Sequence, residues 1–506
     1  MKNIKIKVKI NNVFKEFYVP NNLTVLGALE YINKEYGENI NIQYRASCKA
    51  GQCGSCTMTI NGEPKLACKT KLEYNLKIEP LKNFIVIKDL IVDRGQYYIQ
   101  LNKIRNYTDN NLKINKDGII NNNKNTIEDI EKIKKIRGCI DCMACLSTCP
   151  SREYSEYCGP TIIRQLARFE FDKRDKLNRC EIAFSEKLPN CTTCGKCVEV
   201  CPKEIDIVHN AIEKLREEAF KKGYYLDEHI EVRKNVLQNE KHRTVSKETT
   251  PLLEEVNEEY TAKHEIMKVA FFTGCLVDYR LQDVGKSAIK LLNAHGISVI
   301  IPKNQVCCGS PFIRTGQSDV AQQLKSKNLE IFNNLKELGV EGVVTVCAGC
   351  GSTLKNDYKE KEFNVMDITE LLNKVGLTNY KPYEMEGNKK IKITYHDPCH
   401  LRRGQGIAIE PRKILKHIPN VELIEMDEIK CCGAGGGVRS GVPQLAKVIG
   451  KSKVKSILKT NADIVITVCP FCEYHIKDSL KEYKKENNIE KDIKVMNIAS
   501  LVEKVI

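Results

Sequence analysis

The chain has 506 residues, of which 42% are hydrophobic, and a formal net charge of +15. The length predicts roughly three to four domains. The positive charge suggests a nucleic-acid partner, but the basic residues are scattered among acidic ones, and no basic motif interleaved with aromatic residues occurs, so we expect no nucleic acid.

The cysteine content is the most informative feature of the composition. No run reaches the ~18 apolar residues of a membrane-spanning helix. The basic N-terminus lacks the apolar stretch of a signal peptide, so we expect a cytoplasmic protein with no membrane span. In that reducing compartment the 24 cysteines are expected to be metal ligands rather than disulfides.

Residues 1–105 are predicted to form a small β-rich domain. Residues 4–10 alternate between aliphatic residues and lysines, which predicts a half-buried strand. Residues 23–37 fit a helix. The segment TMTI-NG-EPKLAC predicts a hairpin with an Asn-Gly turn, and this hairpin brings Cys68 back towards Cys56.

The first cysteine group lies in this domain. Its C-x4-C-x2-C spacing occurs in a loop with Gly51 and Gly54, where glycine lets backbone amides turn towards cluster sulfurs. A zinc knuckle is the alternative, but the spacing favours a [2Fe–2S] cluster. The predicted ligands are Cys48, Cys53, Cys56 and Cys68.

Residues 127–238 contain two copies of the pattern C-x2-C-x2-C-x3-C-P, which is typical of bacterial ferredoxins. In this pattern the fourth cysteine binds the other cluster. A zinc site would need neither the third cysteine nor the Cys-Pro. We therefore predict two [4Fe–4S] clusters, one bound by Cys139, Cys142, Cys145 and Cys201, the other by Cys191, Cys194, Cys197 and Cys149.

Two further cysteines, Cys158 and Cys180, fall outside these patterns. We expect them to be buried as small hydrophobic side chains, with an extra ligand or redox role as the alternative. The Asn-rich segment 107–126 is expected to be a connector. Residues 239–266 are polar and interrupted by Pro251, which predicts a linker.

The C-terminal half is an internal duplication, with predicted domains at 267–385 and 386–506. Adjacent cysteines followed by glycine occur in VCCGSP and again in KCCGA, and five cysteines recur after 122 to 124 residues. The first set is Cys275, Cys307, Cys308, Cys347 and Cys350, and the second is Cys399, Cys431, Cys432, Cys469 and Cys472.

Each repeat alternates short β-branched runs with helical stretches, which predicts a parallel sheet. Several of the runs end in cysteine, and ligand sites in such sheets lie beyond the carboxyl ends of the strands. We therefore expect each repeat to gather five thiols at one sheet edge. Five thiols exceed the need of one cubane, and adjacent cysteines suit neighbouring irons. Each repeat is thus predicted to hold its own unusual cluster, with disulfides as the alternative.

Glycines follow both cysteine doublets, at Gly309 and Gly433, and are expected to let the backbone approach the cluster. The stretch CCGAGGGVR lacks the spacing and the later acidic residue of a dinucleotide-binding loop. His396 and His400 flank Cys399. They are expected either to carry protons for thiol chemistry or to serve packing and hydrogen bonding.

Two known families resemble the two halves. Residues 1 to about 235 resemble the iron–sulfur subunit of succinate dehydrogenases and fumarate reductases, in the eleven-residue gap before Cys68 and in the segment YCGPTIIRQLARFEFDKRD. That family usually has an aliphatic residue in place of Cys194 and a three-iron cluster. The cysteine here implies a full [4Fe–4S] cluster.

Residues 268–506 resemble the catalytic CCG-domain subunit of heterodisulfide reductase, whose pattern appears twice. The gap from Cys308 to Cys347 is slightly longer than its counterpart. The resemblance implies two noncubane [4Fe–4S] clusters, with coenzymes M and B handled between them. The implied catalytic residues are Cys307, Cys308, Cys431, Cys432, His396 and His400.

This chain joins both halves, and in this it resembles the thiol:fumarate reductases of methanogens. The implied fold is multidomain α+β and α/β, with a β-grasp [2Fe–2S] ferredoxin domain, a helical ferredoxin-like domain and duplicated α/β CCG domains. The implied reaction oxidises coenzymes M and B to the heterodisulfide. Electrons then pass through the [4Fe–4S] and [2Fe–2S] clusters to an FAD-containing flavoprotein that reduces fumarate.

Three other interpretations remain open at this point. One is the iron–sulfur subunit of a lactate, glycolate or glycerol-phosphate dehydrogenase, against which the N-terminal [2Fe–2S] domain argues. A second is a component of a succinate:quinone oxidoreductase, in which the CCG part is an anchor. The third is a zinc-stapled interaction protein.

Overall fold

The computed structural model describes two compact units, one formed by residues 1–191 and 195–224, the other by residues 192–194 and 225–506. The described residues are 2–37, 40–105, 107, 113–115, 118–120, 125–238, 243–245, 249–384 and 390–506. Most of the predicted connector 107–126 lies outside these residues.

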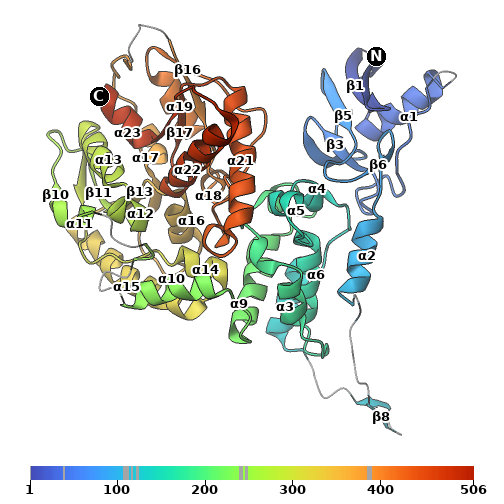
Figure 1. The fold of residues 1–506 in the computed structure, drawn as a ribbon, viewed down its shortest axis with the longest axis horizontal. Helices are drawn as coiled ribbons and strands as arrows, with labels where there is room; N and C mark the ends of the chain where they lie inside the picture. Colours follow the sequence, from blue (N-terminus) through green and yellow to red (C-terminus); the bar gives the residue numbers. More distant parts are fainter. Residues whose placement is uncertain are drawn as a thin grey trace. The chain divides into compact units, whose positions relative to one another are not determined.

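The N-terminal part of the first unit is a five-stranded sheet with the order β2-β1-β5-β3-β4 (Figure 1). Its first strand buries Ile6, Val8 and Ile10 and leaves the lysines between them more exposed, as the alternation predicts. Asn61 and Gly62 form the turn of the predicted hairpin, both with positive φ. The elements are β1 (Asn3–Ile10), β2 (Val13–Pro20), α1 (Val25–Glu35), β3 (Thr57–Ile60), β4 (Glu63–Leu66), β5 (Leu76–Glu79), β6 (Val86–Lys88) and β7 (Ile91–Val92).

The rest of the first unit is mainly helical and packs around its own core, which includes the ferredoxin-pattern cysteines Cys145, Cys149, Cys191 and Cys197. Both copies of the cysteine pattern run into a short helix after a residue with positive φ, Met143 or Gly195. The elements are α2 (Gly95–Lys103), β8 (Lys113–Asn115), β9 (Gly118–Ile120), α3 (Ile127–Ile136), α4 (Ala144–Ser147), α5 (Pro150–Tyr154), α6 (Pro160–Glu170), α7 (Arg179–Ser185), η1 (Leu188–Asn190), α8 (Lys196–Glu199), η2 (Val208–Ile212) and α9 (Glu213–Lys221).

The first repeat of the second unit is built on a sheet with the order β10-β12-β11-β13-β14, parallel except for β10. The predicted linker contributes to it, because β10 pairs with β12. The elements are α10 (Asp227–Gln238), α11 (Leu252–Glu255), β10 (Glu259–Tyr260), β11 (Met267–Phe272), α12 (Gly274–Tyr279), α13 (Gln282–Ala294), β12 (Ile297–Ile300), α14 (Ser310–Thr315), α15 (Ser318–Asn333), η3 (Asn334–Leu338), β13 (Val343–Thr345), α16 (Ala348–Asn356), β14 (Val365–Asp367) and α17 (Ile368–Val375).

The second repeat has a parallel sheet with the order β16-β15-β17-β18, so the predicted α/β duplication is confirmed. The elements are β15 (Ile391–Tyr395), α18 (Cys399–Arg402), α19 (Glu410–His417), β16 (Val421–Leu423), α20 (Val438–Gly441), α21 (Pro443–Lys459), β17 (Ile464–Thr467), α22 (Pro470–Asn487), β18 (Lys494–Asn497), α23 (Ile498–Val502) and η4 (Glu503–Val505).

The two repeats share one hydrophobic core, which contains strand residues of both sheets, such as Val269 and Ile393. Helices of one repeat pack against helices of the other: α13 against α23, α16 against α18, and α17 against α19. Because α16 and α18 each begin at the carboxyl end of a strand, this packing brings the cysteine-bearing edges of the two sheets together.

Candidate metal centres and active site

The predicted [2Fe–2S] loop gathers its four cysteines. The amides of Ala50, Gln52 and Cys53 donate to Cys48 Sγ over 3.2–3.4 Å, as expected for a loop that wraps a cluster ligand. A hydrogen bond from Ser55 lowers the pKa of Cys53 to about 6. Cys56 lies in hydrogen-bond contact with Cys68, and burial raises the pKa of Cys56 to about 11.

The four cysteines assigned to the first ferredoxin-pattern site lie around one cavity. This cavity is lined by Cys139, Cys142 and Cys145 together with Cys201 from the second copy of the pattern. Burial is the main cause that raises the pKa of Cys142, to about 11, and the neighbouring Cys139 and Cys201 thiols raise it further. A Cβ on Gly54 would lie 2.8 Å from Cys142 Cβ, so the [2Fe–2S] loop contacts this site directly.

The second ferredoxin-pattern site surrounds a buried tyrosine. Burial raises the pKa of Tyr157 well above its ordinary value, and the thiols of Cys191, Cys149 and Cys197 lie close enough to raise it further. Cys149 therefore lies near the same tyrosine as Cys191 and Cys197. The Tyr157 hydroxyl has no hydrogen-bond partner among the described residues.

The two cysteines outside the patterns are both buried, as expected. Burial, with Glu186 and Cys149 nearby, raises the pKa of Cys158 well above its ordinary value. Burial raises the pKa of Cys180 to about 12, and Glu170 adds to this. Cys158 thus lies near a predicted cluster ligand.

The five thiols of the first CCG repeat form a continuous chain of contacts. Cys307 contacts Cys275 and Cys308, Cys308 contacts Cys350, and Cys350 contacts Cys347. Cys275 follows β11, the doublet follows β12 and Cys347 follows β13. The thiols therefore meet at the carboxyl edge of the sheet, where the topology predicts a site.

The second repeat reproduces this arrangement and joins it to the first. Cys431 contacts Cys399 and Cys432, and Cys432 Sγ lies 3.4 Å from Cys472 Sγ. Cys469 contacts Cys472 and, across the repeats, Cys347. The ten thiols thus form one array, and the two five-thiol groups meet at Cys347 and Cys469.

The far end of this array reaches another predicted ligand. Cys194 belongs to the same compact unit as the CCG repeats, and its thiol contacts that of Cys431. Arg403 Nη1 donates to the Cys194 carbonyl oxygen over 3.2 Å, which fixes the backbone at this point. A predicted ferredoxin ligand therefore lies next to the second CCG group.

The repeated Cys-Cys-Gly turn has a conformational cause. Gly309 and Gly433 have φ of 82° and 98°, a region that favours glycine. Their amides donate to the sulfurs of Cys307 and Cys431 over 3.5 and 3.3 Å. A Cβ on Gly433 would lie 2.9 Å from Ile449 Cβ, so a larger residue would force the doublet away from α21.

His396 and His400 have different surroundings. The ring of His396 is buried, and neither nitrogen has a hydrogen-bond partner among the described residues. Burial, with Lys453 nearby, lowers the pKa of His396 to about 3. His400 is only partly buried, and its Nδ1 lies 3.4 Å from Cys399 Sγ. His400 is therefore the better placed of the two to exchange protons with solvent.

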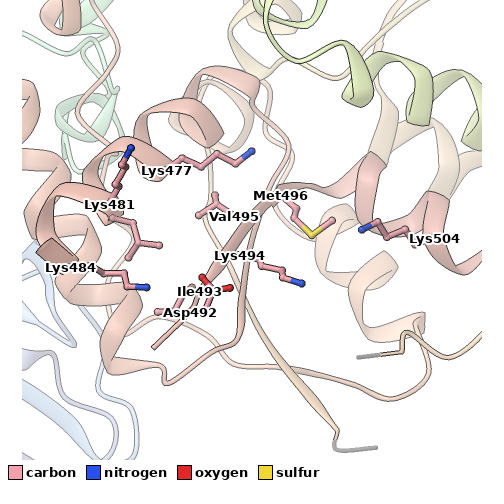
Figure 2. A pocket seen from close by; sticks show the side chains of 10 residues that line it. Lys477, Lys481, Lys484, Asp492, Ile493, Lys494, Val495, Met496 and Lys504 are labelled. Atoms are coloured by element: carbon pink, nitrogen blue, oxygen red, sulfur yellow. The ribbon is translucent and has the colours of Figure 1, made fainter. Parts of the chain in front are cut away.

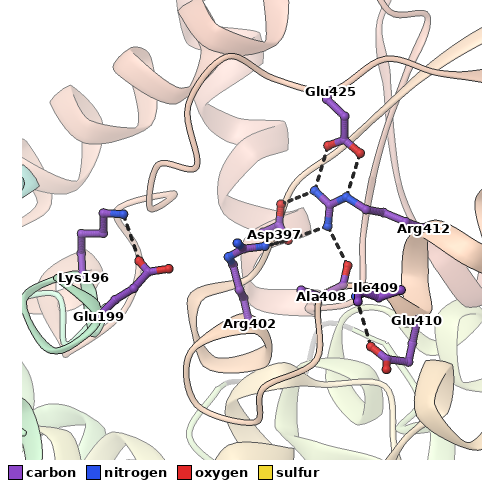
Figure 3. A network of polar contacts seen from close by, with 9 residues as sticks. All are labelled: Lys196, Glu199, Asp397, Arg402, Ala408, Ile409, Glu410, Arg412 and Glu425. Carbon is purple, nitrogen blue, oxygen red and sulfur yellow. Dashed lines mark hydrogen bonds and ion pairs between the residues drawn. The ribbon is translucent and has the colours of Figure 1, made fainter. Parts of the chain in front are cut away.

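An arginine holds the loop that carries His396 and Cys399 (Figure 3). Arg412 donates to both carboxylate oxygens of Asp397 over 2.7 and 2.8 Å and to Glu425 over 2.7 Å. Burial would raise the pKa of Asp397, but the hydrogen bonds and charge of Arg412 hold it below its usual range. The pair ties the loop after β15 to α19.

Sequence reasoning missed two buried cations. Arg243, in the predicted linker, is fully buried beside Cys275 and Cys307, and its Nε lies 3.0 Å from Asp278 Oδ2. Lys453, on α21, is buried near Cys432 and Cys472, and burial lowers its pKa to about 8. A signal for Lys453 was present, because it falls four residues after Ile449 on the apolar face of its helix.

A basic groove of about 680 Å³ lies between α22 and β18 (Figure 2). Lysines surround it, and no cysteine is among the described residues that line it. It is therefore separate from the thiol array. Its charged lining residues are Lys477, Lys481, Lys484, Asp492, Lys494 and Lys504.

The chemistry of the donor groups fits iron–sulfur clusters. None of the 24 cysteines, all within the described residues, is in a disulfide, and 22 of them belong to the groups of four or five that the sequence pattern defines. Thiolates are the usual ligands of such clusters. The unpartnered Tyr157 hydroxyl and His396 ring beside these groups are further polar atoms that a bound cluster would satisfy.

Family models cover all three kinds of site. Residues 3–99 match the 2Fe-2S iron-sulfur cluster binding domain and residues 135–205 the 4Fe-4S dicluster domain. Residues 269–355 and 393–477 each match the cysteine-rich CCG domain. The predicted fold, with its ferredoxin domains and duplicated CCG domains, is confirmed.

Full-length relatives show the family. A fumarate reductase (CoM/CoB) subunit of Methanothermobacter marburgensis is 45% identical over 95% of this chain and 93% of its own length. The chain belongs to this family of fumarate reductase (CoM/CoB) subunits. An uncharacterised iron–sulfur protein of Methanococcus maripaludis is 62% identical over the whole of both chains.

This chain joins ferredoxin modules and CCG modules. A dihydromethanophenazine:CoB–CoM heterodisulfide reductase subunit of Methanosarcina barkeri is 36% identical over 63% of this chain and 78% of its own length. A hypothetical protein from Helicobacter pylori has a similar fold, with 13% identity, a TM-score of 0.61 and coverage of 99% and 94% of the two chains. This chain is thus an iron–sulfur component of an oxidoreductase. Its described residues include no helix that is long and apolar enough to cross a membrane.

Proposed function

We propose that this chain oxidises the thiols of coenzymes M and B to their heterodisulfide and delivers the electrons to a flavoprotein that reduces fumarate. The observation that carries the proposal is the contact between Cys347 and Cys469, which joins two five-thiol groups into one array. Joining two thiols releases two electrons, and two centres that each accept one electron can take them when they lie close together. The full-length match to a fumarate reductase (CoM/CoB) subunit supports the choice of substrates.

The proposed cofactors are one [2Fe–2S] cluster, two [4Fe–4S] clusters and two noncubane [4Fe–4S] clusters. When bound, they accept electrons singly, and their irons favour the thiolate form of a bound thiol. The ten CCG cysteines would hold the pair of centres, and the adjacent residues of each doublet, Cys307 with Cys308 and Cys431 with Cys432, would suit neighbouring irons.

Each turnover releases two protons and two electrons from the two thiols as the sulfur–sulfur bond forms. His400 is the proposed proton acceptor, because its Nδ1 lies beside Cys399 and its ring is partly exposed. His396 is enclosed and has no route of this kind. Gly309 and Gly433 hold the doublets in position.

The proposed electron path leaves the array at its second repeat. Cys431 contacts Cys194, which the ferredoxin pattern assigns to a [4Fe–4S] cluster. Within the first unit, Cys142 contacts the [2Fe–2S] loop at Gly54. From that loop, electrons are proposed to reach an FAD-containing partner protein. A partner is needed because the sequence of this chain contains no flavin-binding fingerprint. The proposed location of the complex is the cytoplasm.

The proposal is tested with the chain and its flavoprotein partner purified together without oxygen. The complex should reduce fumarate with the two thiols as electron donors, and the chain alone should not. The Cys432→Ser and Cys308→Ser variants should lose this activity and keep the [2Fe–2S] spectrum. Cys180→Ser, a buried cysteine outside every group, serves as the control and should stay active. Full activity of both Ser variants would refute the proposal.

A further inference from the structure

The two CCG repeats differ at one position next to the thiols. The residue three places before the first cysteine is Phe272 in the first repeat and His396 in the second. Phe272 is the last residue of β11, and His396 directly follows the equivalent strand, β15. Phe272 packs against Phe332 with ring centroids 5.7 Å apart, in an apolar cluster. The first repeat thus places a hydrocarbon ring where the second places an imidazole.

The imidazole of His396 faces two thiols of the second group. One nitrogen of the ring and the sulfurs of Cys432 and Cys472 all lie within 4.8 Å of one another. This is the separation of donor atoms that share one metal ion. The two sulfurs are themselves 3.4 Å apart.

The polar atoms of the His396 ring are buried and unpaired among the described residues. His396 is 1% exposed, and neither Nδ1 nor Nε2 has a hydrogen-bond partner among the described residues. Buried polar groups are nearly always paired, because an unpaired one loses its hydration without compensation. A bound metal would supply the missing partner of one nitrogen.

The backbone fixes the ring in this place. The His396 amide donates to the Ile466 carbonyl oxygen over 2.8 Å, which continues the ladder between β15 and β17. The next residue, Asp397, is held by Arg412. The backbone that carries the imidazole is therefore held on both sides, as expected for a ligand rather than a mobile group.

We propose that His396 binds an iron of the second CCG cluster, next to Cys432 and Cys472. The second centre then has a mixed nitrogen and sulfur donor set, while the first is held by thiolates alone. The two centres are chemically unequal, and the one with the nitrogen donor is the one beside Cys194. This inference rests on the proposed cluster of the second repeat but is independent of thiol oxidation.

The test uses full-length holoprotein that contains ¹⁵N-labelled histidine, prepared without oxygen. Pulsed electron paramagnetic resonance of the reduced CCG clusters should detect a strongly coupled histidine nitrogen. The coupling should disappear in His396→Phe, which copies the first repeat, and remain in His400→Phe. No strong coupling in the wild type, or its persistence in His396→Phe, would overturn the proposal.

Two controls keep the outcomes distinguishable. If His396→Phe does not load its clusters, the labelled wild type and His396→Gln, which keeps a polar side chain without an imidazole, decide the question. Iron analysis of the same samples separates the role of His396 from the presence of the clusters. Full iron content without histidine coupling contradicts only the role of His396, whereas missing iron in the C-terminal half contradicts the proposed clusters themselves.

Discussion

Replacing Arg412 with methionine should loosen the second CCG centre. Arg412 makes the paired hydrogen bonds that hold Asp397, and the side chains are 18% and 4% exposed. Removing one partner of a buried ion pair costs about 3–5 kcal/mol, because the other charge stays buried with less compensation. Arg412 is partly exposed, so we expect the lower end, about 3 kcal/mol.

This cost should appear as easier opening of the loop that carries His396 and Cys399. About 3 kcal/mol corresponds to roughly a 100-fold change in an equilibrium constant. If iron leaves the second centre through this local opening, its transfer to a chelator without oxygen should be roughly 100-fold faster in Arg412→Met.

A neighbouring arginine provides the matched control. Arg402 Nη1 lies 3.5 Å from Asp397 Oδ1, and its side chain is 29% exposed. Exposed pairs contribute about 0–1 kcal/mol, so Arg402→Met should release iron less than about fivefold faster than the wild type. Equal release rates in the two variants would refute the assignment of Arg412 as the residue that holds the loop.

The remaining predictions concern the clusters. Protein prepared without oxygen should contain about 18 irons per chain with matching sulfide. A content of about 10 irons would show that the two CCG clusters are absent. Cys194→Ile should give a three-iron centre with its oxidised paramagnetic signal, whereas an unchanged spectrum would show that Cys194 is no ligand. Tyr157→Phe should lower the reduction potential of the second ferredoxin-type cluster in a redox titration, because its buried hydroxyl would donate to a cluster sulfur. An unchanged potential would contradict that role.

The cysteine groups could be predicted from the sequence because spacing is a local property. The period of 122 to 124 residues pairs all ten CCG cysteines, and strands that end in cysteine place them at a sheet edge. The contact between Cys347 and Cys469 could not be predicted from the sequence in this way. It depends on the packing of α16 against α18 and on a core shared by both repeats, and neither leaves a local pattern.

The burial of charged residues is the second feature that the sequence did not predict. Arg243 lies in a polar segment that reads as a linker, and its burial depends on Asp278, which is 35 residues away. The difference between Phe272 and His396 was visible once the repeats were aligned. Its meaning was not, because the unpartnered state of the ring nitrogens appears only in three dimensions.

The central claim is that the CCG array oxidises thiols, and one measurement tests it most directly. The isolated, fully loaded chain is mixed without oxygen with coenzymes M and B and an artificial electron-accepting dye. Dye reduction should require both thiols and should yield the heterodisulfide. Dye reduction driven by a quinol, with no response to the thiols, would contradict the claim and favour a quinone-linked function.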